Sequence, residues 1–248
     1  MKAIILAAGY ATRLYPLTKD QPKALLPIGD KPILNYIIEQ IERIDVIDEV
    51  YIIGNAKFVN HLKIWAEEFA SSKEIIILND GSVDNDTRLG AIGGIYFAIE
   101  KMNIQDEVLI ICGDNLFTFS IAEYVEFYQK VLSDCVCVKE VNDAEKLKSF
   151  GVATVNENGI IVDFAEKPAN PKSNLAVFGS YIYTKETMSL FEEYLTEGNN
   201  KDAPGNFVQW LHKIKPIYCF HFEGECFDIG TLAAYEEANE FMASLGFS

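Results

Sequence analysis

The chain has 248 residues, of which 49% are hydrophobic and 12% aromatic, enough apolar material to build the core of one large α/β domain. Its formal net charge of −16 argues against binding to nucleic acid or to an anionic membrane, because those partners are bound by clustered lysine and arginine. No apolar run is long enough to cross a bilayer and no charged-then-apolar leader follows Met1, so we expect a globular protein of the cytoplasm.

The first half of the chain alternates short apolar runs with amphipathic stretches. In chain order, strands are predicted over residues 2–6, 49–53, 74–78 and 108–112, and helices over 33–44, 57–70, 91–101 and 121–132. Continuously apolar strands separated by such helices favour a parallel sheet covered on both faces. We therefore predict a doubly wound, mostly parallel, Rossmann-like sheet, with the loops after Leu6, Leu78 and Cys112 on one ligand-binding rim.

The pattern changes after residue 132, where short strands follow one another closely. They are predicted over 135–139, 152–155, 160–164 and 178–183, and the turn Asn156-Glu157-Asn158-Gly159 predicts a hairpin. This part is expected to be antiparallel. Helices at 188–195 and 206–213, a strand at 217–222 and a closing helix at 232–244 return to alternation.

The cysteines and histidines give no metal signal. Cys112, Cys135, Cys137, Cys219 and Cys226 are scattered without a C-x-x-C pair, so we expect buried free thiols. The three histidines are isolated from one another in the sequence. These residues therefore do not predict a zinc site.

A turn of small residues directly follows the first predicted strand. It reads Leu6-Ala7-Ala8-Gly9-Tyr10-Ala11-Thr12-Arg13, and residues 1–31 carry five basic against two acidic side chains in an otherwise acidic protein. Small residues let backbone N–H groups approach an anion, and nearby cations neutralise its charge, so this segment is typical of a polyphosphate site. Neither G-x-G-x-x-G nor G-K-[ST] occurs, which argues against a dinucleotide site and a Walker-type loop.

The stretch L-A-A-G-Y-A-T-R-L-Y-P-L-T-K-D-Q-P-K-A-L-L-P-I-G-D-K-P-I-L, residues 6–34, resembles the signature of the sugar-phosphate nucleotidyltransferases, which make nucleoside-diphosphate sugars. Ala11 stands where that family has its second glycine. Residues 112–116 and 227–231 look like the two metal-aspartate motifs of the family. Residues 150–152, 165–168 and 173–179 look like its sugar-phosphate lobe and are most similar to glucose-1-phosphate thymidylyltransferases.

The resemblance implies one nucleotidyltransferase domain over residues 1–248, with a nucleotide-binding half (1–133), a part that is mainly the antiparallel sugar-phosphate lobe (134–222), and a last part with a metal aspartate and the closing helix (223–248). It implies that Asp114 and Asp228 bind Mg²⁺. It also implies catalytic roles for these aspartates with Arg13 and Lys23. The implied nucleotide-binding residues are Leu6, Ala7, Ala8, Gly9, Thr12, Arg13, Gly90 and Asp114, and those for the sugar phosphate are Lys23, Gly151, Glu166, Lys167 and Val177.

The chemistry of nucleotidyl transfer agrees with these residue types. The phosphate of a sugar 1-phosphate attacks the α-phosphorus of a nucleoside triphosphate, and pyrophosphate leaves. Because that phosphate has a second pKa of about 6, it is already an anion near neutral pH and needs no general base. The difficulty is the repulsion between two polyanions, which calls for Mg²⁺ and positioned cations.

Other interpretations stay open at this stage. Each aspartate alone fits a turn or helix cap, Lys23 fits a solvated loop lysine, and Glu166-Lys167 fits an exposed pair. The alternative functions are a cytidylyltransferase for a phosphoalcohol such as choline or inositol phosphate, and a non-catalytic nucleotide-sugar-binding regulatory subunit. The sequence leaves the base, the sugar, the role of Arg88 and the oligomeric state undecided, although homo-oligomers are frequent in the family.

Overall fold

The computed structural model describes residues 1–246, which form two compact units. The first unit contains residues 1–88, 111–122 and the segment from Gly224 to the end of the described residues; the second contains residues 89–110 and 123–223. The mixed α/β fold with a mostly parallel sheet is confirmed. No helix within residues 1–246 is long and apolar enough to cross a membrane.

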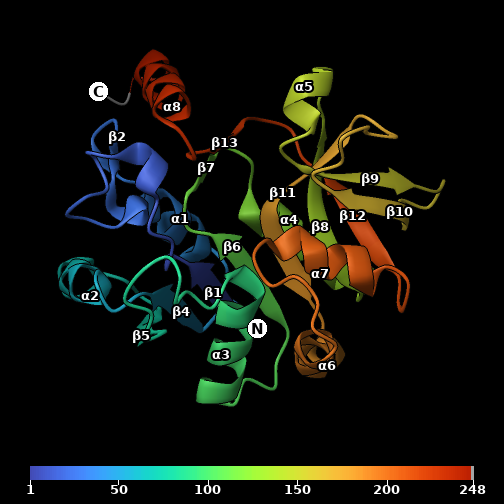
Figure 1. The fold of residues 1–248 in the computed structure, drawn as a ribbon, viewed down its shortest axis with the longest axis horizontal. Coiled ribbons are helices and arrows are strands. Elements are labelled where there is room, and N and C mark those ends of the chain that lie inside the picture. The colour runs from blue at the N-terminus through green and yellow to red at the C-terminus, as the bar shows by residue number, and fades with distance from the viewer. Residues whose placement is uncertain (247–248) are drawn as a thin grey trace. The chain divides into compact units, whose positions relative to one another are not determined.

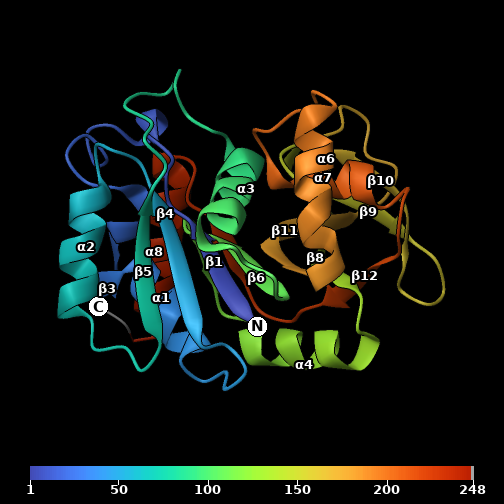
Figure 2. The same cartoon turned by 90° about the horizontal axis from the view of Figure 1, so that it is seen from below.

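The first unit is built on three parallel strands, β1 (Lys2–Leu6), β4 (Glu49–Gly54) and β5 (Glu74–Asn79), seen side by side in Figure 2. Their central residues are apolar, and Ile4, Ile5 and Ile52 are fully buried. Helices α1 (Ile33–Ile41) and α2 (Val59–Glu68) occupy the connections between these strands. Both helices are shorter than predicted.

The boundaries of these two helices have local causes. The Asn55 side chain accepts a hydrogen bond from Phe58 N–H at 2.9 Å, which forms a turn and delays the start of α2. At the end of α1, Ile44 N–H bonds to Ile41 C=O at 3.0 Å, a tighter turn than an α-helix makes. The apolar period continues through both places, so it could not locate these ends.

Four very short strands of the first unit were not predicted. β7 (Asn115–Phe117) pairs antiparallel with β13 (Cys226–Asp228), joining segments more than a hundred residues apart. Figure 1 shows α8 (Leu232–Ser244) beside β2 (Pro27–Ile28), which pairs with β3 (Lys31–Pro32). Tyr235 Oη donates to Pro27 C=O at 2.7 Å, which ties the last helix to the segment that follows the phosphate turn.

Two of the boundaries between the units fall within further elements. β6 (Val108–Cys112) and α4 (Ile121–Val131) each begin in one unit and end in the other. Both elements were predicted, β6 with the same bounds. Gly113, just after β6, donates to Leu6 C=O at 2.9 Å, so the loops after β1 and β6 meet on the predicted rim.

The second unit carries the predicted antiparallel strands: β8 (Asp134–Glu140), β9 (Gly151–Val155), β10 (Ile161–Glu166) and β11 (Leu175–Tyr183). β11 pairs antiparallel with β8 and β9, and β9 with β10 through the predicted hairpin, where Gly159 has φ of 73°. β12 (Ile217–His221) instead runs parallel to β8.

The helices of this unit are α3 (Ala91–Met102), the short α5 (Ala144–Leu147), α6 (Leu190–Thr196) and α7 (Pro204–Leu211). A 3-10 helix, Lys185–Ser189, precedes α6 in place of the first predicted turn. The aromatic rings of Tyr183, Phe191, Tyr194 and Phe207 pack on one another and form much of the local core.

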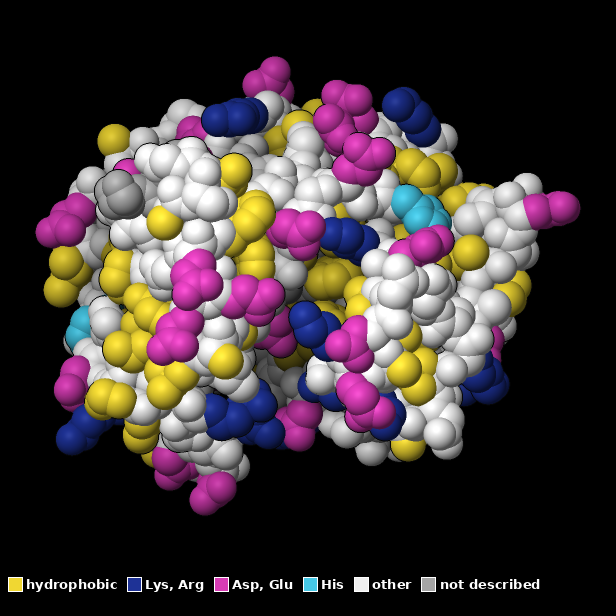
Figure 3. Space-filling view, turned by 90° about the horizontal axis from the view of Figure 1, so that it is seen from above, with side chains coloured by type: hydrophobic (Ala, Val, Ile, Leu, Met, Phe, Trp, Pro, Cys, Tyr) yellow, Lys and Arg dark blue, Asp and Glu magenta, His cyan; other side chains and the backbone are white. Residues whose placement is uncertain are grey.

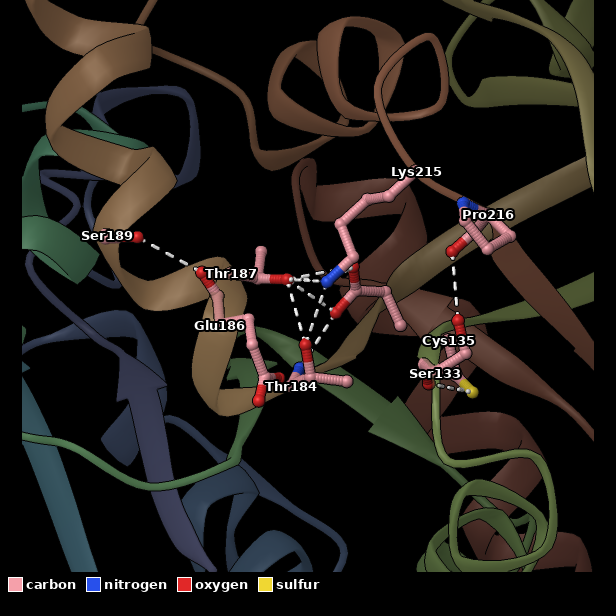
Figure 4. A network of polar contacts seen from close by, with 9 residues as sticks. Ser133, Cys135, Thr184, Glu186, Thr187, Ser189, Lys215 and Pro216 are labelled. Atoms are coloured by element: carbon pink, nitrogen blue, oxygen red, sulfur yellow. Dashed lines mark hydrogen bonds and ion pairs between the residues drawn. The ribbon is translucent and has the colours of Figure 1, made fainter.

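A buried ion pair joins three segments of the second unit (Figure 4). Lys215 Nζ lies 3.0 Å from Asp134 Oδ2 and donates to the hydroxyls of Thr184 at 2.9 Å and Thr187 at 2.7 Å. Asp134 also accepts from Thr184 N–H and the Thr187 hydroxyl, both at 2.8 Å. This network fixes the start of β8 against the end of β11 and the loop before β12.

The five cysteines are free, as predicted, but only Cys135, Cys137 and Cys219 are buried; Cys112 and Cys226 are partly exposed. The prediction of buried thiols is therefore wrong for Cys226, while Cys112 is partly exposed as a residue although its thiol is desolvated. Figure 3 shows acidic side chains scattered over one face of the molecule rather than gathered in one patch, with lysine and arginine between them.

Candidate active site

The turn after β1 is stabilised by hydrogen bonds to the end of β4 and the residue that follows it. Ala7 N–H donates to Ile53 C=O at 2.9 Å, and the Asn55 amide donates to Ala8 C=O at 2.9 Å. Gly9 is exposed, and a Cβ built on it would meet nothing within 4 Å. Since neither packing nor a positive φ requires a glycine there, its small size leaves room for a ligand to approach the backbone.

Ala11 takes a left-handed backbone conformation. Its φ and ψ are 48° and 42°, and its carbonyl accepts from Leu14 N–H at 2.9 Å and from the Thr18 hydroxyl at 2.8 Å. The glycine of the family is therefore replaced without loss of the turn, at the energetic cost that a Cβ imposes in this region. Thr12 and Arg13 follow it on the exposed side.

Lys23 and Asp114 form an ion pair in this unit. Lys23 begins a 3-10 turn (Lys23–Leu25), and Asp114 follows Gly113, where a Cβ would lie only 2.9 Å from Leu6 C=O. Gly113 thus lets the chain leave β6 directly beside the phosphate turn. As a result, the predicted catalytic lysine and one predicted metal aspartate lie together near Leu6.

Asp228 lies beside Asp114 through the β7–β13 pair. Asp228 is opposite Asn115, and Ile229 N–H donates to Asp114 C=O at 3.0 Å. A Cβ built on Gly230 would lie 3.6 Å from Asp228 Oδ1 and 3.8 Å from Arg13 Nη2, so the carboxylate and the guanidinium surround the same point. The strand that contains Asp228 was not predicted from the sequence. Asp228 is the last residue of β13, and Thr231 caps α8.

The electrostatics at Cys112 show the same convergence. Burial raises the pKa of this thiol well above its usual value, the Asp114 and Asp228 carboxylates raise it further, and Lys23 opposes them. Both aspartates and the lysine therefore act on one place. Within residues 1–246 no group of three or more His, Cys, Asp or Glu side chains could hold a metal.

Two aspartates are enough protein ligands for Mg²⁺, although they would be too few for an ion that is bound by protein ligands alone. Mg²⁺ prefers oxygen ligands and usually keeps several positions for water and substrate phosphates. Asp114 and Asp228 would hold the ion, and a bound polyphosphate would complete its shell. The donor set of the first unit thus fits the predicted ion.

The predicted sugar-phosphate residues of the second unit lie in one row across three strands. Glu166, at the end of β10, is opposite Gly151 of β9, which in turn is opposite Val177 of β11. Lys167 follows Glu166 with φ of 48°, and its N–H donates to Phe150 C=O at 3.0 Å. The sheet register therefore brings together four residues that are up to 26 positions apart in the sequence.

The Glu166 carboxylate is partly buried and accepts no hydrogen bond from the residues that the structure describes. Burial raises its pKa above the ordinary value, and the Lys167 ammonium opposes that shift. A desolvated acceptor of this kind gains when a ligand supplies donors such as paired hydroxyls.

Gly90 belongs to the second unit, where it precedes α3 with φ of 79°. A Cβ there would lie 2.6 Å from Lys201 C=O, and Ile92 N–H donates to the same carbonyl at 3.0 Å. The glycine is therefore required by its conformation and by packing against Lys201. The sequence predicts a nucleotide contact for Gly90 and gives no sign of its packing against Lys201.

Several residues that shape the sites were missed. Tyr10 Oη donates to Ser82 C=O at 2.9 Å and so connects the phosphate turn to the loop after β5, while Asn55 supports Ala8. Asn55 follows a buried strand at the ligand-binding rim, and that position was a usable signal. Gly205 and Gln209, which contact Glu166, lie just before and within the helix predicted over 206–213, and they gave no signal.

The fold and the two sites define an α/β protein of a class that binds nucleotides at the carboxyl ends of parallel strands. A model of the nucleotidyl transferase family matches residues 2–244, and the chain belongs to this family.

Similar proteins support the assignment. The chain is 32% identical to the bifunctional protein GlmU of Methanocaldococcus jannaschii over 98% of its own length and 54% of that relative. It is 27% identical to a UTP–glucose-1-phosphate uridylyltransferase of Bacillus subtilis over 92% of this chain and 86% of the relative. The chain thus spans about half the length of the archaeal GlmU protein it matches.

Solved structures show the same fold. A Bacillus anthracis protein described as a glucose-1-phosphate thymidylyltransferase, crystallised with sucrose, superposes with a TM-score of 0.82 at 26% identity, covering 97% of this chain and 94% of that one. A UDP-glucose pyrophosphorylase in complex with UDP-glucose superposes with a TM-score of 0.80 at 25% identity, covering 98% of each chain.

Proposed function

We propose that this chain transfers a nucleotidyl group from a nucleoside triphosphate to a sugar 1-phosphate with the help of Mg²⁺, releasing pyrophosphate and a nucleoside-diphosphate sugar. The observation that carries the proposal is the ion pair of Lys23 with Asp114, next to Asp228 and directly beside the turn after β1. We further propose that the reaction takes place in the cytoplasm.

Different residues of the first unit bind different phosphates of the triphosphate. The backbone of residues 6–9 and Thr12 faces the phosphates, and Arg13 neutralises the β- and γ-phosphates. Lys23 holds the α-phosphate together with the incoming phosphate, which reduces the repulsion between the two anions. When bound by Asp114 and Asp228, Mg²⁺ supplies further neutralisation of the phosphate charge.

The residues of the second unit hold the sugar phosphate. Glu166 accepts hydrogen bonds from sugar hydroxyls, Lys167 binds the phosphate, and Gly151 and Val177 form the floor of the row. The unpartnered carboxylate in this row supports a polyhydroxylated substrate over choline phosphate. Sugar hydroxyls can donate hydrogen bonds to this carboxylate, whereas the quaternary ammonium of choline has no N–H or O–H group to donate.

The test is pyrophosphate release over a matrix of nucleoside triphosphates (dTTP, UTP, CTP, GTP and ATP) and a panel of sugar 1-phosphates and phosphoalcohols, with Mg²⁺ or with EDTA. We expect release with at least one sugar 1-phosphate, and none in EDTA. Release only with a phosphoalcohol and CTP would favour the cytidylyltransferase. Tight nucleotide binding without release for any pair would identify a regulatory subunit, and undiminished activity in EDTA would contradict the role of the metal.

A further inference from the structure

The Glu166 carboxylate lies between two glycines of different elements in the second unit. A Cβ built on Gly151 would lie 2.9 Å from Glu166 Oε2, and one built on Gly205 would lie 1.9 Å from the same atom. The second distance is shorter than any non-bonded contact, so a side chain at position 205 would occupy the place of the carboxylate. Gly205 is buried in the first turn of α7.

α7 also binds the backbone of Glu166. The Glu166 N–H donates to Gln209 Oε1 at 2.9 Å. Gln209 lies four residues after Gly205, so both residues are on the same face of α7. The helix therefore contacts the end of β10 at two points, one on the side chain of Glu166 and one on its main chain.

The N-terminal end of α7 cannot easily move away from Glu166. Pro204 occupies the first helical position and favours the helical φ there. Just before it, Lys201 C=O accepts from Ile92 N–H at 3.0 Å and packs against Gly90. Near the C-terminal end of the helix, Trp210 Nε1 donates to Glu197 Oε2 at 2.9 Å. These contacts hold α7 against the carboxylate from the side of α3 and of the preceding loop.

We propose that Gly205 and Gln209 are positioning residues that fix the Glu166 carboxylate and thereby determine which sugar hydroxyls it can accept from. The inference rests on the proposed function of Glu166 and adds the element that sets its place. Gly205 leaves room for the Glu166 carboxylate, and Gln209 holds the Glu166 main chain through its hydrogen bond. A bulkier residue at position 205 would displace the carboxylate from the space between Gly151 and Gly205 and so change its position relative to the sugar.

The central experiment is a double-mutant cycle between Gly205→Ala and Glu166→Ala. Because a displacement of about 1 Å in a binding group can cost up to about a hundredfold, we expect Gly205→Ala to raise the KM for the sugar 1-phosphate at least about tenfold. The KM for the triphosphate should stay within about twofold, since that substrate is bound elsewhere. On the Glu166→Ala background, Gly205→Ala should change the sugar-phosphate KM by less than about twofold.

Two further variants define the controls. Gln209→Met keeps the volume and removes the acceptor for Glu166 N–H, so it should raise the same KM in the same direction. Asn206→Ala, one residue after Gly205, should leave all constants unchanged. An equal effect of Gly205→Ala with and without the Glu166 carboxylate would overturn the proposal, as would an unchanged sugar-phosphate KM in the single variant.

Thermal unfolding keeps the inference testable if no substrate pair releases pyrophosphate. In that case the proposed function fails, but the contact between Gly205 and Glu166 still predicts a non-additive effect on Tm. Gly205→Ala should lower Tm when Glu166 is present and should not lower it on the Glu166→Ala background, where alanine is the better helix former. A loss of Tm that is the same on both backgrounds would overturn the positioning role.

Discussion

Replacing Lys215 with methionine should destabilise the second unit strongly. Lys215 Nζ has all three of its donors engaged, with Asp134 Oδ2 at 3.0 Å and the hydroxyls of Thr184 and Thr187 at 2.9 and 2.7 Å. The Asp134 side chain is 0% exposed and that of Lys215 is 22% exposed. Methionine keeps most of the volume but leaves the buried carboxylate without its counter-ion.

The size of the effect follows from this geometry. Breaking a buried ion pair by removing one partner costs about 3–5 kcal/mol. Asp134 keeps two donors, Thr184 N–H and the Thr187 hydroxyl, and the partial exposure of Lys215 lets water replace the ammonium. We therefore expect the lower end, about 3 kcal/mol, which corresponds to a fall in Tm of about 6–12 °C for a chain of this size.

The assay is thermal unfolding followed by circular dichroism and by calorimetry. Lys213→Met is the matched control, because Lys213 is exposed and two residues away, and it should leave Tm nearly unchanged. The double variant Asp134→Asn with Lys215→Met should be more stable than Lys215→Met alone, since the uncompensated charge is gone. A Tm for Lys215→Met equal to that of the Lys213 control would refute the reasoning.

Three further predictions concern the sites. Lys23→Ala should slow turnover at least about a hundredfold, or about 2.7 kcal/mol of transition-state stabilisation, with the fold intact by circular dichroism; near-normal turnover would remove Lys23 from the mechanism. Ala11→Gly should leave the stability unchanged or raise it by up to about 1 kcal/mol in urea unfolding, because Ala11 has φ of 48°, whereas Ala98→Gly within α3 should lower it. Burial raises the pKa of Glu166 in the folded protein, so the stability of the native state should fall as the pH rises from the ordinary value of 4.5 through the folded pKa. The Glu166→Gln variant should lack this pH dependence and should be more stable at neutral pH, but it should bind the sugar phosphate less well. Equal pH slopes of Tm for both proteins would contradict this assignment.

The sequence was informative wherever a signal is local. Apolar periodicity located β1, β6 and α8 with their bounds, and the Asn-Gly turn located the β9–β10 hairpin. It gave no sign of β7 and β13, because each has three residues and gains its hydrogen bonds from a segment more than a hundred residues away. For the same reason the sequence did not indicate that Asp228 lies in a strand, which only the pairing with Asn115 shows.

The same distinction separates the functional residues from those that position them. Lys23, Asp114 and Glu166 are recognisable because polar residues at strand ends and in a long motif carry chemical meaning of their own. Gly205 carries no such chemical meaning by itself, because its importance depends on the Glu166 carboxylate, 39 positions earlier in the chain. A carboxylate that is desolvated and lacks a donor is unfavourable for the empty protein. The absence of side chains at Gly151 and Gly205 leaves the space that the Glu166 carboxylate occupies, so this space is a property of the fold rather than of the motif.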